Sequence, residues 1–177
     1  MKIHTKFSTL VSQSRSMGGL VYEGKVVTER ELAGKKAGFH YCDYRDTANQ
    51  CAELGMDFHL YAGSSAHKIN EMYGETAVIH PGKSFQDLMT CVSRHDWGLV
   101  GNTLYSSQWQ ETLPNKLYEY LACGVPVVAI NAKASSEIIE DLDIGITVES
   151  IQELADRWRE HEDTRLIVTG KPHARYS

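Results

Sequence analysis

"LPNKLYEYLACGVPVVAI", residues 113–130, predicts a helix that leads directly into a buried strand. Pro114 suits the first position of a helix, because the backbone N–H that proline lacks would be unpaired there anyway. Gly124 suits the helix end, where a left-handed backbone is common. The run "VPVVAI" that follows is apolar throughout, as expected for a strand covered on both faces of a sheet. The stretch therefore indicates an α/β fold.

The same alternation of strand and helix continues on both sides of this stretch. Apolar runs predict further strands within residues 19–27, 57–64, 76–82, 97–102 and 146–149. Residues with helical spacing predict helices within 44–56, 67–74, 84–96, 135–145 and 150–162, whereas the polar segment 103–112 is expected to be a loop. In the helix of 84–96, Ser84 is the expected N-cap, and Phe85, Leu88, Met89 and Val92 form the expected apolar face. Together these elements predict an open parallel sheet with helices on both faces, formed by residues 19–177 after a loose N-terminal arm, 1–18.

Composition excludes several classes of function. A net charge of −5 argues against a nucleic-acid-binding protein, which would carry a basic face. No apolar run approaches the roughly 20 residues of a transmembrane helix, and no secretory signal precedes the domain, so a cytoplasmic location is expected. The four cysteines lack zinc-site spacing and the eight histidines are scattered, so no metal site is predicted. His80 precedes Pro81 at an expected strand end and could line the ligand cleft, but a structural or solvated role is the favoured interpretation.

The start of the helix after Pro114 has the character of an anion site. The free amides of Asn115, Lys116 and Leu117 would point out of the helix toward a ligand. Lys116 in the first turn is unfavourable beside the helix dipole unless an anion lies there as well. Glu119, three residues on, suits a ribose diol, and Glu111 suits a second hydroxylated group, so the pattern matches a nucleotide-sugar. An ordinary surface pair of Lys116 and Glu119 remains the alternative.

Residues 111–129, "ETLPNKLYEYLACGVPVVA", resemble the donor-binding signature of GT-B glycosyltransferases, specifically the retaining, family-4-like group. Glu111 and Glu119 have the Glu-x7-Glu spacing of that group, and the resemblance extends over residues 19–158. It implies a single Rossmann-like domain, the C-terminal half of a GT-B enzyme. The sequence departs from the pattern at Thr112–Leu113, where many members have a Phe-Gly pair.

The resemblance also implies roles for individual residues. Glu119 would hold the ribose hydroxyls. Glu111 would be the catalytic residue, which contacts the donor sugar or helps to position it at the reacting carbon. Lys116 and Lys25 would neutralise the diphosphate, with Arg45 as a weaker phosphate candidate. The backbone of residues 79–82 would meet the base. Apart from the resemblance, Gly24 and Gly82 lie at expected strand ends, where small residues let a ligand approach the backbone, and Asn115 would contribute its amide at the helix start. The donor would be a UDP- or GDP-sugar, bound as substrate without a cofactor or a metal.

A GT-B enzyme needs two Rossmann-like domains, and this chain has about half the usual length. The sequence therefore predicts the donor-binding half of a glycosyltransferase of hexosyltransferase type. A missing N-terminal domain or a separate acceptor-binding polypeptide would supply the rest. The alternative is a non-catalytic nucleotide or nucleotide-sugar binding module. A sugar-nucleotide epimerase is disfavoured, because it also needs two domains.

Overall fold

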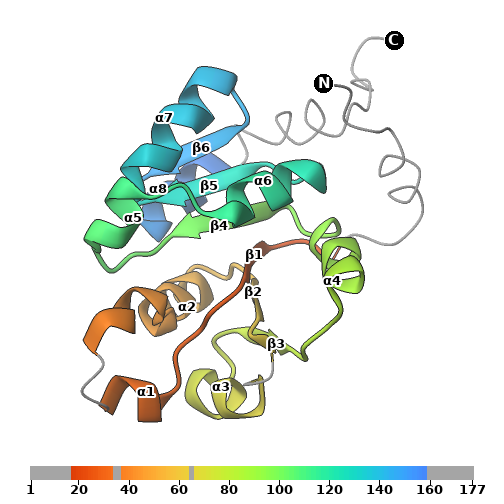
Figure 1. Ribbon diagram of the computed structural model, residues 1–177, viewed down its shortest axis with the longest axis vertical. Helices are drawn as coiled ribbons and strands as arrows, with labels where there is room; N and C mark the ends of the chain where they lie inside the picture. Colours follow the sequence, from red (N-terminus) through yellow and green to blue (C-terminus); the bar gives the residue numbers. More distant parts are fainter. Residues whose placement is uncertain (1–16, 34–36, 64–65, 159–177) are drawn as a thin grey trace.

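The computed structural model describes residues 17–33, 37–63 and 66–158, which form a six-stranded sheet covered by helices (Figure 1). All neighbouring strands pair in parallel, in the order β3-β2-β1-β4-β5-β6. The strands are β1 (Leu20–Glu23), β2 (Phe58–Tyr61), β3 (Val78–His80), β4 (Trp97–Gly101), β5 (Val127–Ile130) and β6 (Gly145–Val148). This is the strand order of a Rossmann fold, and the predicted fold class is confirmed.

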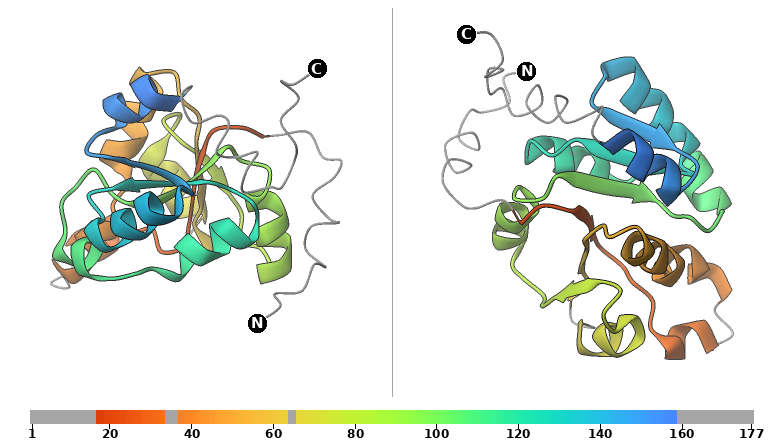
Figure 2. Two further views of the ribbon diagram at one scale, coloured as in Figure 1. Left: turned by 90° about the horizontal axis from the view of Figure 1, so that it is seen from above. Right: turned by 180° about the vertical axis from the view of Figure 1, so that it is seen from behind.

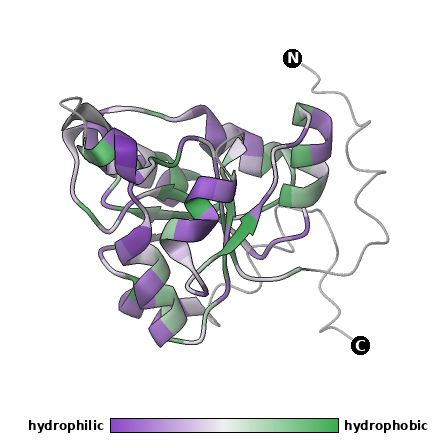
Figure 3. Cartoon of the chain, turned by 90° about the horizontal axis from the view of Figure 1, so that it is seen from below, coloured by the Kyte–Doolittle hydropathy of each residue, from purple (hydrophilic) through white to green (hydrophobic). Residues whose placement is uncertain are grey.

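Helices lie on both faces of the sheet. They are α1 (Glu29–Ala33), the 3-10 helix η1 (Ala37–Cys42), α2 (Arg45–Glu53), α3 (Ala66–Tyr73), α4 (Phe85–Val92), α5 (Ser107–Glu111), α6 (Asn115–Ala122), α7 (Lys133–Leu142) and α8 (Ile151–Arg157). Helices α2 and α8 lie on the face opposite α6 and α7 (Figure 2). Because successive strand residues point to opposite faces, Tyr22 joins the core beneath α2 and α8, and Val21 joins the core beneath α6. The hydrophobic colour of the strands and the mixed colour of the helices agree with this layering (Figure 3).

Strands β1 and β4 separate toward their carboxyl ends. Leu20 and Val21 pair with β4, opposite Trp97 and Gly98, whereas all four residues of β1 pair with β2. The chain leaves β1 toward β2 on one side and leaves β4 toward β5 on the other, so this is where the strand order reverses. In open α/β sheets the ligand lies beyond the carboxyl ends of the strands at such a point.

Helices also occur in two segments for which the sequence pattern predicted none. Residues 103–112 were expected to be a loop, but Ser107–Glu111 form α5, with Ser106 as the N-cap. The side chain of Ser106 accepts a hydrogen bond from the Gln108 amide, and Trp109 is buried, so capping and burial offset the polar character of the segment. The connection after β1 likewise contains α1 and η1.

Two details of the predicted helices are also wrong. Pro114 is the N-cap of α6 rather than its first residue, because its ψ of 145° is extended. As a result the Leu117 amide donates to the Pro114 carbonyl, and the predicted anion site keeps the amides of Asn115 and Lys116. In α4, Ser84 caps the helix as predicted, but Phe85 at the helix start is 64% exposed. Met89 and Val92, farther along α4, are the residues that reach the core.

The predicted arm, residues 1–18, lies almost wholly outside the described residues, as does the end of the predicted domain from residue 159. Within the described ranges, every helix is too short or too polar to traverse a lipid bilayer.

Tyr120 on α6 connects that helix to the point where the strands separate. Its hydroxyl accepts a hydrogen bond from the Glu23 amide (3.3 Å) and donates to the Val21 carbonyl (3.4 Å). Its ring lies directly on Gly98 of β4, where an added Cβ would come within 2.3 Å of the ring. A glycine at position 98 therefore allows α6 to approach the sheet closely enough for these bonds.

We predict that Gly98→Ala destabilises the chain by about 2 kcal/mol or more, because the methyl group would overlap the Tyr120 ring. Urea unfolding of the variant and the wild type would measure this change in the free energy of unfolding. Gly74→Ala is the control: its Cβ would meet nothing within 4 Å, and its φ of +55° alone should cost about 1 kcal/mol. Equal losses in the two variants would contradict the close approach of Tyr120 to β4.

Candidate functional site

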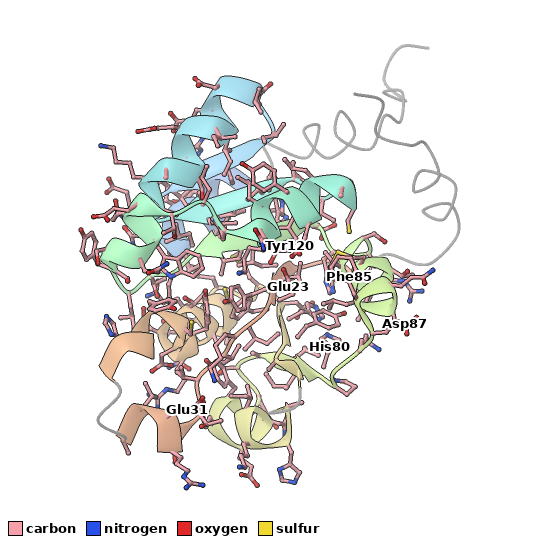
Figure 4. All side chains as sticks on the ribbon, viewed as in Figure 1. Glu23, Glu31, His80, Phe85, Asp87 and Tyr120 are labelled. Carbon is pink, nitrogen blue, oxygen red and sulfur yellow. The ribbon has the colours of Figure 1, made fainter. Side chains whose placement is uncertain are left out.

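The candidate site lies where β1 ends, beneath the first turns of α6. Three charged side chains meet there: Glu23, the last residue of β1, and Lys116 and Glu119 on α6. We call these three residues the strand-end cluster. Figure 4 shows Glu23 and Tyr120 side by side at this point. The two helix residues are three positions apart, so they share one face of α6.

Glu23 is an acid at the end of a buried strand. Its side chain points to the same face of the sheet as Val21, and the residue is 8% exposed. Burial and hydrogen bonding to Glu119 raise the pKa of Glu23 to about 7, against an opposing effect of the Lys116 charge. A carboxyl group that is buried beside another carboxylate retains its proton, because two close negative charges repel each other. Glu23 therefore retains its proton in mildly acidic solution and ionises near pH 7, and its protonated carboxyl group can donate a hydrogen bond to Glu119.

Lys116 is a half-buried cation without a direct ion pair among the described residues. Its Nζ lies 5.1 Å from the ring centroid of Tyr22 and 5.5 Å from that of Trp109. Two aromatic faces at these distances attract a cation. Burial lowers the pKa of Lys116, and the nearby Glu23 opposes this change. Cys42 is also close, but burial raises the pKa of its thiol to about 11, so it adds no charge at neutral pH.

Gly24 leaves the approach to Lys116 open. Its φ of +129° is a backbone conformation that residues with a side chain rarely adopt. A Cβ at this position would lie 3.5 Å from the Lys116 Nζ, so the ammonium group sits directly over the backbone of the loop after β1. The amides of Asn115 and Lys116 begin α6 at the same place. An anion here would meet a charged amine and the positive end of a helix dipole.

Two predicted phosphate-binding residues already have partners. Lys25 forms an ion pair with Glu31, and Glu31 in turn accepts hydrogen bonds from the amide and hydroxyl of Thr28 at the start of α1. Arg45 binds both carboxylate oxygens of the buried Asp43, with a shortest distance of 2.7 Å. These contacts satisfy both cations within the chain. A role with phosphate stays a prediction for Lys25 and Arg45, and it would require each to exchange its partner.

The other predicted residues lie around the strand ends. Glu111 is exposed at the last position of α5, and Asn115 is exposed at the first position of α6. Gly82 follows β3, where a Cβ would lie 3.1 Å from the carbonyl carbon of Gly63. This glycine is thus needed for the close approach of two loops, whether or not a ligand lies there. The structure brings Lys116, Glu119 and Gly24 together.

Sequence reasoning missed Glu23. A strand was predicted within residues 19–27, which contain Glu23, but only Gly24 and Lys25 in this segment were predicted to bind the ligand. One feature could have identified it: an acidic residue at the end of an apolar strand, directly before a glycine, at the first strand of an α/β sheet. Burial of such an acid has a cost unless a partner lies close. That partner, Glu119, is 96 positions away in the sequence, and only the fold brings the two together.

The chain matches the family described as glucosyltransferase 3-like, C-terminal domain, over residues 39–168. The matched region includes α5 and α6, and therefore Glu111, Lys116 and Glu119. It begins after β1, so Glu23 and Gly24 lie outside it. A search of curated proteins finds no match.

Solved glycosyltransferase structures share the fold at low sequence identity. AviGT4, a glycosyltransferase involved in avilamycin A biosynthesis, is 15% identical with a TM-score of 0.54 over 90% of this chain. WaaG, a glycosyltransferase involved in lipopolysaccharide biosynthesis, is 14% identical with a TM-score of 0.55 over 95%. The C-terminal CMP-Kdo binding domain of WaaA from Acinetobacter baumannii is 9% identical with a TM-score of 0.51 over 95%. The chain spans 48% of AviGT4 and 46% of WaaG, but 96% of the WaaA domain.

The raised pKa of Glu23 predicts a pH dependence of stability. An unfolded glutamate loses its proton near pH 4.5, whereas folded Glu23 keeps it to about pH 7. Between these values the folded state binds more protons, so the free energy of unfolding falls as pH rises. Glu23→Gln, which cannot ionise, should lack this decrease. Between about pH 4 and about pH 8, the free energy of unfolding of the variant should therefore rise relative to that of the wild type by at most about 3 kcal/mol.

Urea unfolding at several pH values would measure this gain. Glu137→Gln is the matched control, because Glu137 is exposed on α7 and its substitution should change stability by less than about 0.5 kcal/mol at each pH. A stability difference between Glu23→Gln and wild type that stays constant with pH would show that Glu23 does not retain its proton on folding.

Proposed function

The chain belongs to the glucosyltransferase 3-like C-terminal domain family, and from this premise we propose that the strand-end cluster binds the nucleotide-sugar donor of a glycosyltransferase. The family match and the shared fold confirm the prediction of a GT-B C-terminal domain. The retaining, family-4-like grouping stays a prediction. The observation that carries the proposal is Lys116, a half-buried cation without a direct ion pair among the described residues, held over Gly24 at the switch point of the sheet.

The diphosphate would lie against Lys116, beside the loop after β1. Burying a lysine is unfavourable unless an anion compensates for the lost hydration. A diphosphate would supply that charge, and it would also accept hydrogen bonds from the amides of Asn115 and Lys116. The same contacts would stabilise the negative charge that develops on the leaving diphosphate during sugar transfer. Gly24 would allow the phosphates to approach the backbone.

Glu119 would hold the ribose. A carboxylate has two oxygens with which it can accept hydrogen bonds from neighbouring hydroxyls. Below about pH 7, where Glu23 retains its proton, it would donate to one Glu119 oxygen and orient the carboxylate. The remaining acceptor positions of Glu119 would be available to the diol. In this arrangement Glu23 is a positioning residue, and it would also limit the negative charge close to the diphosphate.

The remaining residues would complete the donor site from neighbouring loops. Glu111, exposed at the end of α5, would be the catalytic residue that contacts or positions the donor sugar. Residues 79–82 at the end of β3 would meet the base. Lys25 and Arg45 would contribute to phosphate binding by leaving Glu31 and Asp43. A UDP- or GDP-sugar is the proposed donor.

The acceptor would be bound elsewhere. Because the chain spans about half the length of AviGT4 and WaaG, we assign to residues 19–177 the donor-binding domain of a two-domain enzyme. An N-terminal domain or a separate polypeptide would bind the acceptor and close over the donor. This chain alone would then bind donor but transfer sugar poorly. Adding the acceptor-binding part should restore transfer, whereas a non-catalytic binding module would remain inactive.

We predict that Lys116→Met and Glu119→Gln each weaken binding of a UDP- or GDP-sugar by at least about 10-fold, since each loses a charge-assisted contact. Isothermal titration of the purified chain would measure the affinities. Lys133→Met is the matched control, because Lys133 is exposed at the start of α7 and should leave the affinity unchanged. Wild-type affinity in both cluster variants would overturn the proposed site.

The affinity for a UDP-sugar should also depend on pH. The diphosphate of such a donor carries a constant charge between about pH 6 and about pH 9, whereas Glu23 ionises near pH 7. Above this value a second negative charge faces the diphosphate, so binding should weaken several-fold. Glu23→Gln should remove the decrease. If the variant and the wild type show the same pH profile, Glu23 does not face the donor.

A further inference from the structure

We propose that His59, His80 and His95 form a binding site for one divalent transition-metal ion, with Zn²⁺ as the expected ion. Each of the three rings offers a nitrogen, and these nitrogens lie within 4.8 Å of one another. We call the three residues the histidine cluster. The sequence interpretation that the histidines are scattered is wrong for these three, because the fold brings them together. The cluster adjoins the proposed donor site, because His80 belongs to residues 79–82, but it does not include Lys116, Glu119 or Glu23.

Three separate elements provide the histidine cluster. His59 is in β2, His80 ends β3 beside it, and His95 lies in the turn between α4 and β4. Figure 4 labels His80 on the side of the strands toward α4. The Nδ1 of His59 and the Nε2 of His80 are 3.0 Å apart. Two ligand nitrogens of a tetrahedral zinc ion would be roughly 3.3 Å apart, so this pair already has nearly the required separation.

His95 is oriented as a metal ligand usually is. Its Nδ1 lies 2.8 Å from the Gly18 carbonyl oxygen, and a carbonyl can only accept, so Nδ1 carries the proton. The lone pair of a neutral His95 is then on Nε2, toward the Tyr61 hydroxyl at 3.2 Å. Donation of the remaining ring N–H to a backbone carbonyl is the usual arrangement for histidines that bind metals. A metal ion would replace the Tyr61 hydroxyl as the partner of Nε2.

His59 uses only one of its two ring nitrogens within the described part of the chain. Its Nε2 is buried and has no hydrogen-bond partner among the described residues. Buried polar atoms without a partner are rare, because each loses its hydration without compensation. The nitrogen that faces His80 is Nδ1, so an ion would bind His59 through Nδ1 and fix the ring with its proton on Nε2. The ring centroids of His59 and His95 are only 4.4 Å apart, so no residue separates them.

The composition of the histidine cluster favours a late transition metal. Imidazole nitrogens suit Zn²⁺, Cu²⁺ and Ni²⁺, whereas Ca²⁺ and Mg²⁺ prefer oxygen ligands. No carboxylate belongs to the group found among the described residues, although Asp57 is close enough to act on His59, and His95 and Lys83 act on His80. A bound ion would join β2 and β3, at one edge of the sheet, to the turn that precedes β4. Its expected role is therefore to stabilise this edge.

Titration of the chain with Co²⁺, which replaces Zn²⁺ and has visible absorption, would test the site. The protein should carry no affinity tag that contains histidine. We expect one Co²⁺ per chain with the intense absorption of a tetrahedral site, displacement by Zn²⁺, and a higher midpoint of thermal unfolding with Zn²⁺. X-ray absorption of the zinc-bound wild type should show three imidazole ligands.

His80→Ala should weaken Co²⁺ binding on the order of 100-fold or more, because one of three protein ligands is lost. His67→Ala is the matched control: His67 is exposed on α3, pairs with Glu71, and should bind as the wild type does. Circular dichroism of the metal-free variants would confirm folding. Equal binding by the two variants, no stoichiometric uptake by the wild type, or a zinc spectrum dominated by oxygen ligands would each overturn the proposal. The X-ray absorption spectrum uses the wild type alone, so it still tests for three imidazole ligands if His80→Ala does not fold.

Discussion

The contact between Tyr120 and Gly98 determines where the functional side chains of this domain lie. The ring of Tyr120 rests on a strand position that has no side chain, and its hydroxyl bonds the backbone of β1 on either side of Tyr22. This contact holds α6 at the point where β1 and β4 separate. Lys116 and Glu119 are one turn or less from Tyr120 on the same helix, so their positions over the strand ends follow from it.

The charges at the strand ends suit an anionic ligand with hydroxyl groups. Lys116 lies over two aromatic rings and forms no direct ion pair with Glu23 or Glu119, and Glu23 is protonated below about pH 7. Lys25 and Arg45 differ from Lys116, because each has a carboxylate partner within the chain. Of the three cations predicted to bind phosphate, all within the described ranges, Lys116 forms no ion pair, whereas Lys25 and Arg45 would have to change partners. This is consistent with half of a donor site that a second domain completes.

Much of the fold was predictable because it depends on local patterns. Apolar strand runs, the Ser84 cap and the helix before β5 all appear directly in the sequence. The errors concern residues whose environment is set by distant parts of the chain. The polar segment that contains Trp109 forms a helix whose tryptophan packs into the core. Phe85, by contrast, is exposed although it fits the apolar pattern of its helix. The pairing of Glu23 with Glu119 likewise depends on the crossing of α6 over β1.

The most direct test of the donor-site assignment is a crystal structure of this chain with a bound UDP- or GDP-sugar. The account predicts the diphosphate against Lys116 and the first amides of α6, with the ribose hydroxyls on Glu119. Glu23 should lie behind Glu119, without direct contact with the ribose. A nucleotide bound at the amino ends of the strands, or at the carboxyl ends but away from α6, would contradict the account.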